Sequence, residues 1–302
     1  MYSLWEKPLP RLADHIVNCA VFLYKSEAHA KAGHESGGSG FLVHVRSSAT
    51  PAVGHLYAIT NKHVLDKGYC TLRLTKKQGG IDTIQSNRQD WRPHPHGWDV
   101  EVLPLNIGDS FQWWSIDTKM FISRDIIDRF NVGLGDEAFL IGRLVTHAGQ
   151  QRNAPIVRFG NVSLMADPNE PIRLGKLDQE SFLVECRSLS GFSGSPVFIT
   201  TSQSYSEEAA ERLVGQPKGG FTSGTSKIEL RGMWGGTYGP WLLGIDCAHI
   251  PLWKPVFEWD HETKTSYLVE QNTGIAVVIP AWEIFSTLND RELVKERKKR
   301  RP

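Results

Sequence analysis

The 302-residue sequence is poor in cysteine, and its cysteines lack the spacings used by metal sites and disulfide-rich folds. None of them form a Cys-x-x-Cys pair, which argues against a zinc site and against a dense disulfide framework. They are Cys19, Cys70, Cys186 and Cys247. Scattered cysteines of this kind suit a reducing compartment.

The sequence also lacks a long apolar run. A helix that crosses a bilayer needs about 20 consecutive apolar residues, and no stretch provides them. The first residues, MYSLWEKP, have neither the basic start nor the apolar segment of a secretory signal peptide. We therefore expect a soluble, cytoplasmic protein with no membrane partner.

An excess of charge of either sign is missing as well. Lys and Arg total 34 against 33 for Asp and Glu, so the balance gives no reason to expect nucleic acid as a partner. The exception is a basic run at residues 295–301, which is either a solvated end or a segment for docking or nucleic-acid binding. His94 and His96 could share one strand face, but no third ligand is suitably spaced, so we expect no metal.

What the sequence does have is a series of short apolar stretches rich in Val, Ile, Leu and Phe, bounded by Gly, Pro, Asn and Asp. This pattern is typical of antiparallel β proteins. The candidate strands are residues 16–24, 40–45, 56–60, 71–74, 100–104, 137–141, 156–163, 182–186, 195–200, 241–246 and 274–279. They form two clusters around 123–135, where a capped helical turn enters a Gly-rich loop. We predict one barrel in residues 1–125 and a second in 126–302.

Two segments of the second half differ from this pattern. Residues 281–299 have apolar side chains spaced on one face, which predicts a C-terminal helix packed on the second barrel. Residues 201–240 are too long and polar for an ordinary hairpin connection. We interpret them as an insertion that is either flexible or regulatory.

The run GFSGSP at residues 191–196 has the composition of a nucleophile loop. A serine hydroxyl needs a base to take its proton as it attacks a carbonyl, and the oxyanion that forms needs preorganised donors. Flanking glycines let backbone N–H groups approach that oxygen without a clashing Cβ. The same composition suits a surface turn, so this run alone does not decide between them.

Two upstream segments favour the catalytic interpretation. His63 comes shortly after the β-branched run at the end of a candidate strand, and Asp99 opens another such strand. Taken singly, each has a simpler interpretation, as a structural histidine and a surface aspartate. Their chain order, His63, then Asp99, then Ser193, is the order of chymotrypsin-type serine proteases and differs from that of subtilisins and α/β-hydrolases.

With these residues the sequence resembles the trypsin-like peptidases, and within them the disulfide-poor bacterial branch that includes HtrA-type proteases and glutamyl endopeptidases. The resemblance covers about residues 19–279. Besides the triad segments, the matching runs are GSGFLV at 38–43, GDEAFLIG at 135–142, VRFGNV at 157–162, LGIDCA at 243–248 and NTGIAVVIP at 272–280. It implies an all-β fold of two six-stranded antiparallel β-barrels with a C-terminal helix.

The resemblance also implies an activity and the residues that carry it. The activity is peptide-bond hydrolysis through an acyl-enzyme, with no cofactor. Ser193 would be the nucleophile, His63 the general base and Asp99 the group that orients the histidine. The backbone amides of Gly191 and Ser193 would form the oxyanion hole.

Two positions depart from the family pattern. Phe192 stands where secreted trypsins carry the aspartate that pairs with a new N-terminus after zymogen cleavage, and Val64 replaces the cysteine that follows their catalytic histidine. We therefore expect no activation by N-terminal processing. The oxyanion loop must be ordered by its own packing or by a regulatory protein partner.

The resemblance places the substrate pocket just before the nucleophile and along residues 246–249. The predicted lining residues are Arg187, Ser188, Asp246, Cys247, Ala248 and His249. Asp246 favours a basic P1 residue in a protein or peptide substrate, whereas Arg187 and His249 favour an acidic one. The alternative to a peptidase is a catalytically silent binding or scaffold protein on the same fold.

Overall fold

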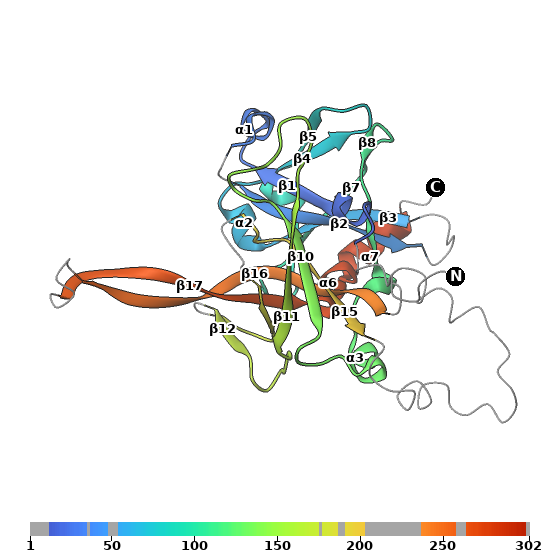
Figure 1. The fold of residues 1–302 in the computed structure, drawn as a ribbon. Coiled ribbons are helices and arrows are strands. Elements are labelled where there is room, and N and C mark those ends of the chain that lie inside the picture. The colour runs from blue at the N-terminus through green and yellow to red at the C-terminus, as the bar shows by residue number, and fades with distance from the viewer. Residues whose placement is uncertain are drawn as a thin grey trace, which may run out of the picture.

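The computed structural model describes residues 12–34, 37–47, 54–174, 177–186, 191–202, 237–257 and 264–299. Two β-sheets dominate these residues, one above the other in Figure 1. The predicted all-β class is confirmed. The division of the chain at residues 125 and 126 stays a prediction.

The first sheet contains nine strands, of which seven are hydrogen-bonded in the order β5-β4-β1-β2-β3-β7-β6. They are β1 (Ala20–Tyr24), β2 (Gly38–Arg46), β3 (Gly54–Thr60), β4 (Thr71–Lys76), β5 (Ile81–Gln85), β6 (Arg92–Pro93), β7 (Glu101–Leu105), β8 (Phe111–Gln112) and β9 (Ile116–Asp117). Within the described residues, β5 and β6 do not pair, so this sheet differs from the expected closed six-stranded barrel. Pro93 cannot donate a backbone hydrogen bond, which suits an edge strand.

The second sheet closes into a six-stranded barrel in the order β10-β11-β14-β17-β16-β15. Its strands are β10 (Glu137–Gly142), β11 (Ile156–Leu164), β14 (Phe182–Glu185), β15 (Pro196–Ser202), β16 (Thr237–Phe257) and β17 (Lys264–Pro280). A short hairpin of β12 (Ile172–Leu174) and β13 (Leu177–Gln179) stands beside it. The prediction of a six-stranded C-terminal barrel is confirmed.

The ends of the expected insertion belong to this barrel. Thr201 pairs with Tyr238 and Ser202 pairs with Thr237, so residues 201–202 and 237–240 are strand residues. The prediction was wrong at both ends because these residues are polar or small, which hid their pairing. Residues 203–236 lie outside the described residues.

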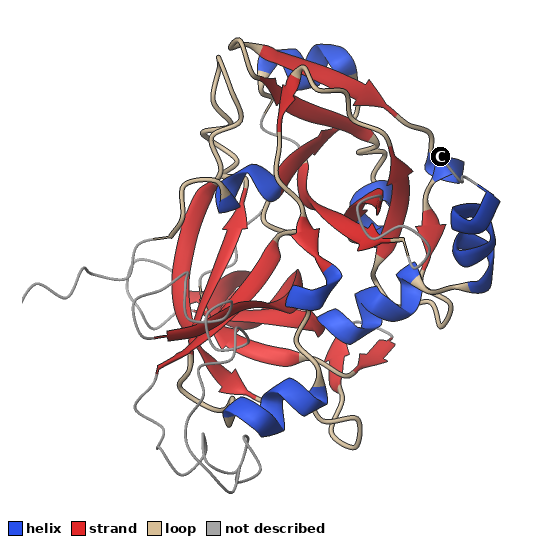
Figure 2. Cartoon of the chain, turned by 90° about the vertical axis from the view of Figure 1, so that its right-hand side faces the viewer, coloured by secondary structure: helices blue, strands red, loops and turns tan. Residues whose placement is uncertain are grey.

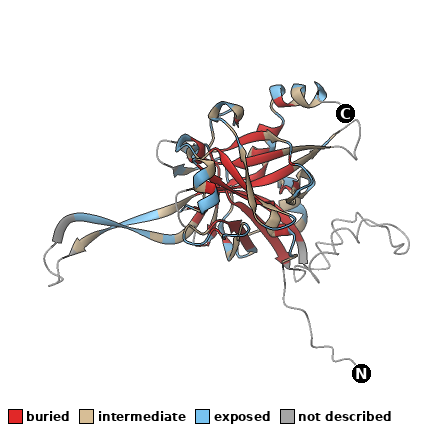
Figure 3. Ribbon diagram, turned by 90° about the horizontal axis from the view of Figure 1, so that it is seen from above, coloured by how far each residue is buried: buried red, intermediate tan, exposed pale blue. Residues whose placement is uncertain are grey.

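β16 and β17 continue beyond the barrel as a long two-stranded arm (Figure 1). Pairing with the neighbouring strands ends near Ile245 on β16 and Ile275 on β17, whereas the two strands pair with each other out to Phe257 and Lys264. Figure 3 shows that the arm is largely exposed. Its exposed large apolar side chains are Leu252, Trp253, Tyr267, Leu268 and Val269. The sequence analysis missed this arm, having ended one strand at residue 246 and begun the next at 274.

The helices of the described residues are few and short: α1 (Glu27–Ala32), α2 (Lys62–Asp66), α3 (Arg124–Phe130), α6 (Ala281–Leu288) and α7 (Arg291–Lys299), with 3-10 turns at Ile16–Cys19, Arg88–Asp90 and Thr118–Met120. The expected turn after residue 123 is α3, and the Ser123 hydroxyl accepts a hydrogen bond from the Ile126 amide as its cap. The strand expected at residues 16–24 begins only at Ala20.

The predicted helix at 281–299 is interrupted between α6 and α7. Asp290 accepts a hydrogen bond from the Glu292 amide with its carboxylate, a local bond that starts a new helix. α6 contacts β7 of the first sheet as well as β16 and β17 of the second, and Leu288 and Leu293 lie in the largest core cluster. The two helices therefore flank both sheets, as Figure 2 shows, and not the second barrel alone.

Candidate active site

His63 and Asp99 are brought together by the pairing of two neighbouring strands. β3 ends at Thr60 and β7 begins at Glu101, and these two residues are partners in the antiparallel register. Residues that leave β3 and residues that enter β7 must therefore lie side by side. His63 falls in the first turn of α2, just after β3, and Asp99 falls just before β7.

The Asp99 carboxylate holds His63 at two points. Asp99 Oδ2 lies 2.6 Å from the ring nitrogen His63 Nδ1, and Asp99 Oδ1 accepts the His63 backbone amide at 2.9 Å. The side chain of Asn61 donates to the Asp99 carbonyl at 2.8 Å. An ionised carboxylate only accepts hydrogen bonds, so the proton of a neutral ring stays on Nδ1 and the lone pair of Nε2 is available to accept a proton.

Ser193 lies in a tight loop that packs against the end of β3. Gly191 and Gly194 both have positive φ angles, of 95° and 91°. A Cβ on Gly194 would collide with the Ser39 carbonyl oxygen and the Thr60 hydroxyl, so this position accepts only glycine. Since Thr60 comes shortly before His63, the nucleophile loop and the histidine segment are neighbours.

Among the residues that the structure describes, no hydrogen bond joins Ser193 Oγ to His63. Catalytic hydrogen bonds are often long or poorly aligned in proteins without substrate and shorten when substrate binds. The structure brings His63 and Asp99 into contact and places the backbone of Ser193 beside Ser39, while the roles of the three residues stay predictions.

The predicted substrate pocket is only partly described. Arg187 and Ser188 lie outside the described residues. Asp246 is fully buried, with its backbone bonded to Gly194 and Ser195. Cys247 is buried, while Ala248 and His249 are half-exposed.

One side chain in this group already has a partner. His249 Nε2 lies 2.6 Å from Glu270 Oε1, at the base of the arm. The histidine is thereby paired with a carboxylate of the same chain, so it is less available to bind an acidic P1 residue of a substrate.

Two buried thiols beside the site are poor nucleophiles. Burial, with the nearby Asp99 and Asp246 carboxylates, raises the pKa of Cys247 well above its usual value, and its thiol donates to the Val277 carbonyl at 3.3 Å. Burial, with Asp246 adding to it, raises the pKa of Cys186 to about 11. Only a thiolate attacks efficiently, so neither of these cysteines is a candidate nucleophile.

Several contacts near the site could not be read from the sequence. The guanidinium of Arg158 lies 5.1 Å from the ring centre of the buried Phe192. The fully buried ring of His94 bonds Glu283 of α6 at 2.9 Å and stacks on Trp98, the neighbour of Asp99. The Arg158–Phe192 and His94–Glu283 contacts join residues far apart in the chain, which a single sequence does not reveal.

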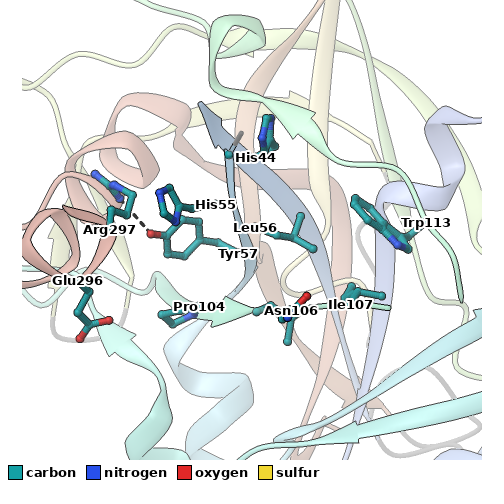
Figure 4. Close-up of a pocket in the computed structure, with 12 residues that line it drawn as sticks. His44, His55, Leu56, Tyr57, Pro104, Asn106, Ile107, Trp113, Glu296 and Arg297 are labelled. Atoms are coloured by element: carbon teal, nitrogen blue, oxygen red, sulfur yellow. Dashed lines mark hydrogen bonds between the residues drawn. The ribbon is translucent and has the colours of Figure 1, made fainter. Parts of the chain in front are cut away.

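A cavity of about 400 Å³ lies away from these residues (Figure 4). Its lining includes Tyr57, Trp113 and Arg297, and Arg297 donates to the Tyr57 hydroxyl at 3.2 Å. It is lined by residues 54–57 at the start of β3 and 104–107 at the end of β7, whereas His63 and Asp99 lie at the other ends of these strands. The cavity is therefore not the predicted substrate pocket.

Arg297 also belongs to the basic run at residues 295–301. It donates to the Leu288 carbonyl at 2.5 Å as well as to Tyr57, and thus ties α7 to the first sheet. This part of the run has a structural role, in contrast to the two interpretations offered by the sequence. Residues 300–302 lie outside the described residues.

No group of three or more His, Cys, Asp and Glu side chains is placed to hold a metal ion in the described part of the chain. No helix there has the length and apolar character needed to span a bilayer.

Comparison with known proteins adds little beyond the topology. No protein-family model matches the chain, and no curated protein matches it. Among solved structures the chain is similar to Rv3671c from M. tuberculosis H37Rv, crystallised as a serine-to-alanine mutant in an inactive form. The identity is 13%, the alignment covers 93% of this chain and 96% of that chain, and the TM-score is 0.41.

A likeness this weak transfers no residue role and no activity. The fold is described from the strand order instead: a closed six-stranded antiparallel barrel stands beside a nine-stranded sheet. This all-β arrangement is consistent with the chymotrypsin-like fold of two β-barrels. Function on this fold has to be argued from the site.

Proposed function

We propose that this chain is a serine endopeptidase that cleaves a protein or peptide substrate through an acyl-enzyme. The observation that carries the proposal is the double contact between Asp99 and His63, which fixes both the backbone and the ring of the histidine. This contact supports a general base with one nitrogen committed and the other available. Ser193, in a glycine-flanked loop beside the same strand end, supplies the hydroxyl.

The reaction follows from these roles. Ser193 Oγ bonds to the substrate carbonyl carbon while its proton moves to His63 Nε2. The carbonyl oxygen becomes an oxyanion, which the amides of Gly191 and Ser193 stabilise. Collapse breaks the carbon–nitrogen bond, and His63 returns the proton to the departing amine. A water molecule then releases the acyl group by the same steps in reverse, so no cofactor is needed.

The second candidate is a catalytically silent binding or scaffold protein. It is favoured by one observation: in the described part of the chain, no hydrogen bond joins Ser193 Oγ to His63. In this case the fold would present a surface, and the histidine–aspartate contact would serve only to hold α2 against β7.

Hydrolysis of peptides separates the two candidates. We expect the purified chain to cleave members of a mixed peptide library, and Ser193→Ala to cleave none. Ser195→Ala is the matched control, because Ser195 is a neighbouring, fully buried serine whose hydroxyl has no hydrogen-bond partner. Cleavage by Ser193→Ala, or none by the folded wild type, would favour the scaffold.

The same library tests the substrate preference. We propose a basic P1 residue on the strength of Asp246, since His249 is already paired with Glu270. A library in which acidic or aromatic P1 residues dominate the products would overturn this specificity.

The compartment and a regulatory partner are further proposals. We propose the cytoplasm because all four cysteines are free of disulfides. A regulatory protein partner stays a prediction based on Phe192, which cannot form the zymogen ion pair. Labelling of Ser193 with and without a candidate partner would test it.

A further inference from the structure

Ser39 is a fully buried serine whose polar atoms are all engaged. Its hydroxyl donates to the Gly191 carbonyl at 2.7 Å and accepts the Arg143 amide at 3.0 Å. Its amide donates to the Ser193 carbonyl at 3.0 Å, and its carbonyl accepts the Thr60 hydroxyl at 2.7 Å. One residue of β2 therefore contacts the nucleophile loop twice, and it also contacts Arg143, just after β10, and Thr60, at the end of β3.

These contacts fix consecutive peptide planes in the nucleophile loop. Ser39 holds the carbonyls of Gly191 and Ser193, and the carbonyl between them, that of Phe192, accepts the Ser195 amide at 2.8 Å. The Phe192 carbonyl and the Ser193 amide share one rigid plane. The Ser195 amide thus fixes the peptide plane that carries the Ser193 N–H, a proposed oxyanion donor. Ser39 fixes the carbonyls of the peptide planes before and after it.

The loop needs such support because its backbone is unusual. Gly191 has a φ of 95°, and a Cβ there would meet Val145 and Arg143. An ion pair cannot hold the loop, since Phe192 has no charge. Phe192 is instead fully buried in the largest core cluster.

We propose that Ser39 is the positioning residue that sets the Gly191–Ser193 loop in its oxyanion-binding conformation. The inference rests on the proposed peptidase function and makes it more specific: the loop is ordered from within the chain, by a hydroxyl of the first sheet, without proteolytic activation. Ser39 itself does not touch the substrate. It acts through the Gly191 and Ser193 carbonyls.

The test compares Ser39→Ala with a variant that loses another serine hydroxyl, one that likewise donates to a backbone carbonyl and accepts an N–H. Ser86 donates to the Cys70 carbonyl at 2.6 Å and accepts the Trp91 indole N–H at 2.9 Å, so Ser86→Ala is the matched control. Both variants and the wild type are assayed for kcat, KM and thermal unfolding. Their affinity for a peptide aldehyde, whose adduct places an oxyanion in the hole, is measured as well.

We expect Ser39→Ala to lower kcat by about 10- to 100-fold, less than the loss of a donor itself, and to leave KM within about twofold. Aldehyde affinity should fall in parallel with kcat, because the adduct mimics the transition state. Ser86→Ala should lose stability but keep kcat. A purely structural Ser39 would instead lower stability and leave kcat unchanged per folded molecule.

Ser39→Cys covers the case in which Ser39→Ala fails to fold. A thiol is a weak hydrogen-bond donor and acceptor of similar shape, so kcat should again fall. If the wild type turns over and neither Ser39 variant changes kcat, the positioning role is wrong while the peptidase proposal stands. If the folded wild type shows no turnover and no aldehyde binding, the peptidase proposal fails and the role of Ser39 fails with it.

Discussion

Arg88 holds the buried carboxylate of Glu101 with both of its terminal nitrogens, at 2.6 and 2.5 Å. The Glu101 side chain is 0% exposed, and Arg88 is 41% exposed and also contacts Asp66. Burial raises the pKa of Glu101, and Arg88 opposes that rise. The pair sits at the start of β7, just after Asp99.

Removal of Arg88 should destabilise the protein in a pH-dependent way. Arg88→Met leaves a buried charge unpaired, which costs about 3–5 kcal/mol near neutral pH. It also raises the folded pKa of Glu101 further. Between the ordinary and the raised pKa of Glu101, the folded protein holds a proton that the unfolded chain has released. The stability lost in Arg88→Met therefore becomes smaller as the pH falls toward the ordinary pKa of the carboxyl group.

Urea unfolding at several pH values measures this effect. Asp66→Asn is the control, because Asp66 is an exposed partner of the same arginine and its removal should cost less than about 1 kcal/mol. A loss in Arg88→Met that is the same at every pH would contradict the account.

Asp99→Asn should nearly abolish turnover while the fold persists. An amide can donate to His63 Nδ1 and so stabilise the tautomer that cannot act as base, and kcat should fall by about ten-thousandfold. Asp117→Asn is a matched control: Asp117 likewise accepts a side-chain nitrogen, Arg46 Nε at 2.6 Å, and a backbone amide, that of Lys119. Steady-state rates that fall equally in both variants would argue against a special role for Asp99.

The cysteines should be inert until the protein unfolds. All four are buried, and burial raises the pKa of each thiol. Ellman's reagent should react quickly only in denaturant. Stability should also fall as the pH rises above the ordinary thiol pKa, because unfolded chains lose those protons first. Rapid reaction of a thiol in the folded protein would show that a cysteine is accessible.

Two deletions should separate the insertion from the barrel. Ser202 and Thr237 are cross-strand partners, so an Asn-Gly turn can replace residues 203–236. This shorter loop has less closure entropy to lose, and the free energy of unfolding should stay equal or rise. Removing 201–240 also deletes paired strand residues and should cost about 1–3 kcal/mol. A lower melting temperature for the first deletion would be the contrary result.

Local patterns were sufficient to predict much of the fold. Alternating apolar runs predicted most strands, and the Ser123 cap predicted α3. These features depend on residues that are close in sequence. The proximity of His63 and Asp99 does not: it depends on the pairing of β3 with β7, and the sequence pointed to it only through the chain order and the family resemblance.

The features that were missed depend on distant contacts. Ser39 and Gly191 are separated by 152 positions, and His94 and Glu283 by 189, so nothing in either local pattern points to its partner. The arm was missed for another reason: its strands have no barrel core to face, so the usual alternation of buried and exposed residues is lost. Pro251 and Pro255 interrupt it further.

The most direct test of the central claim is covalent labelling by a fluorophosphonate, read by intact mass and peptide mapping. Ser193 Oγ displaces fluoride from the probe only when a neighbouring base activates it. The account predicts one label per chain, on Ser193, in the wild type and in Ser195→Ala, and none in Ser193→Ala. A folded wild type that takes no label, or a label that persists in Ser193→Ala, would contradict it.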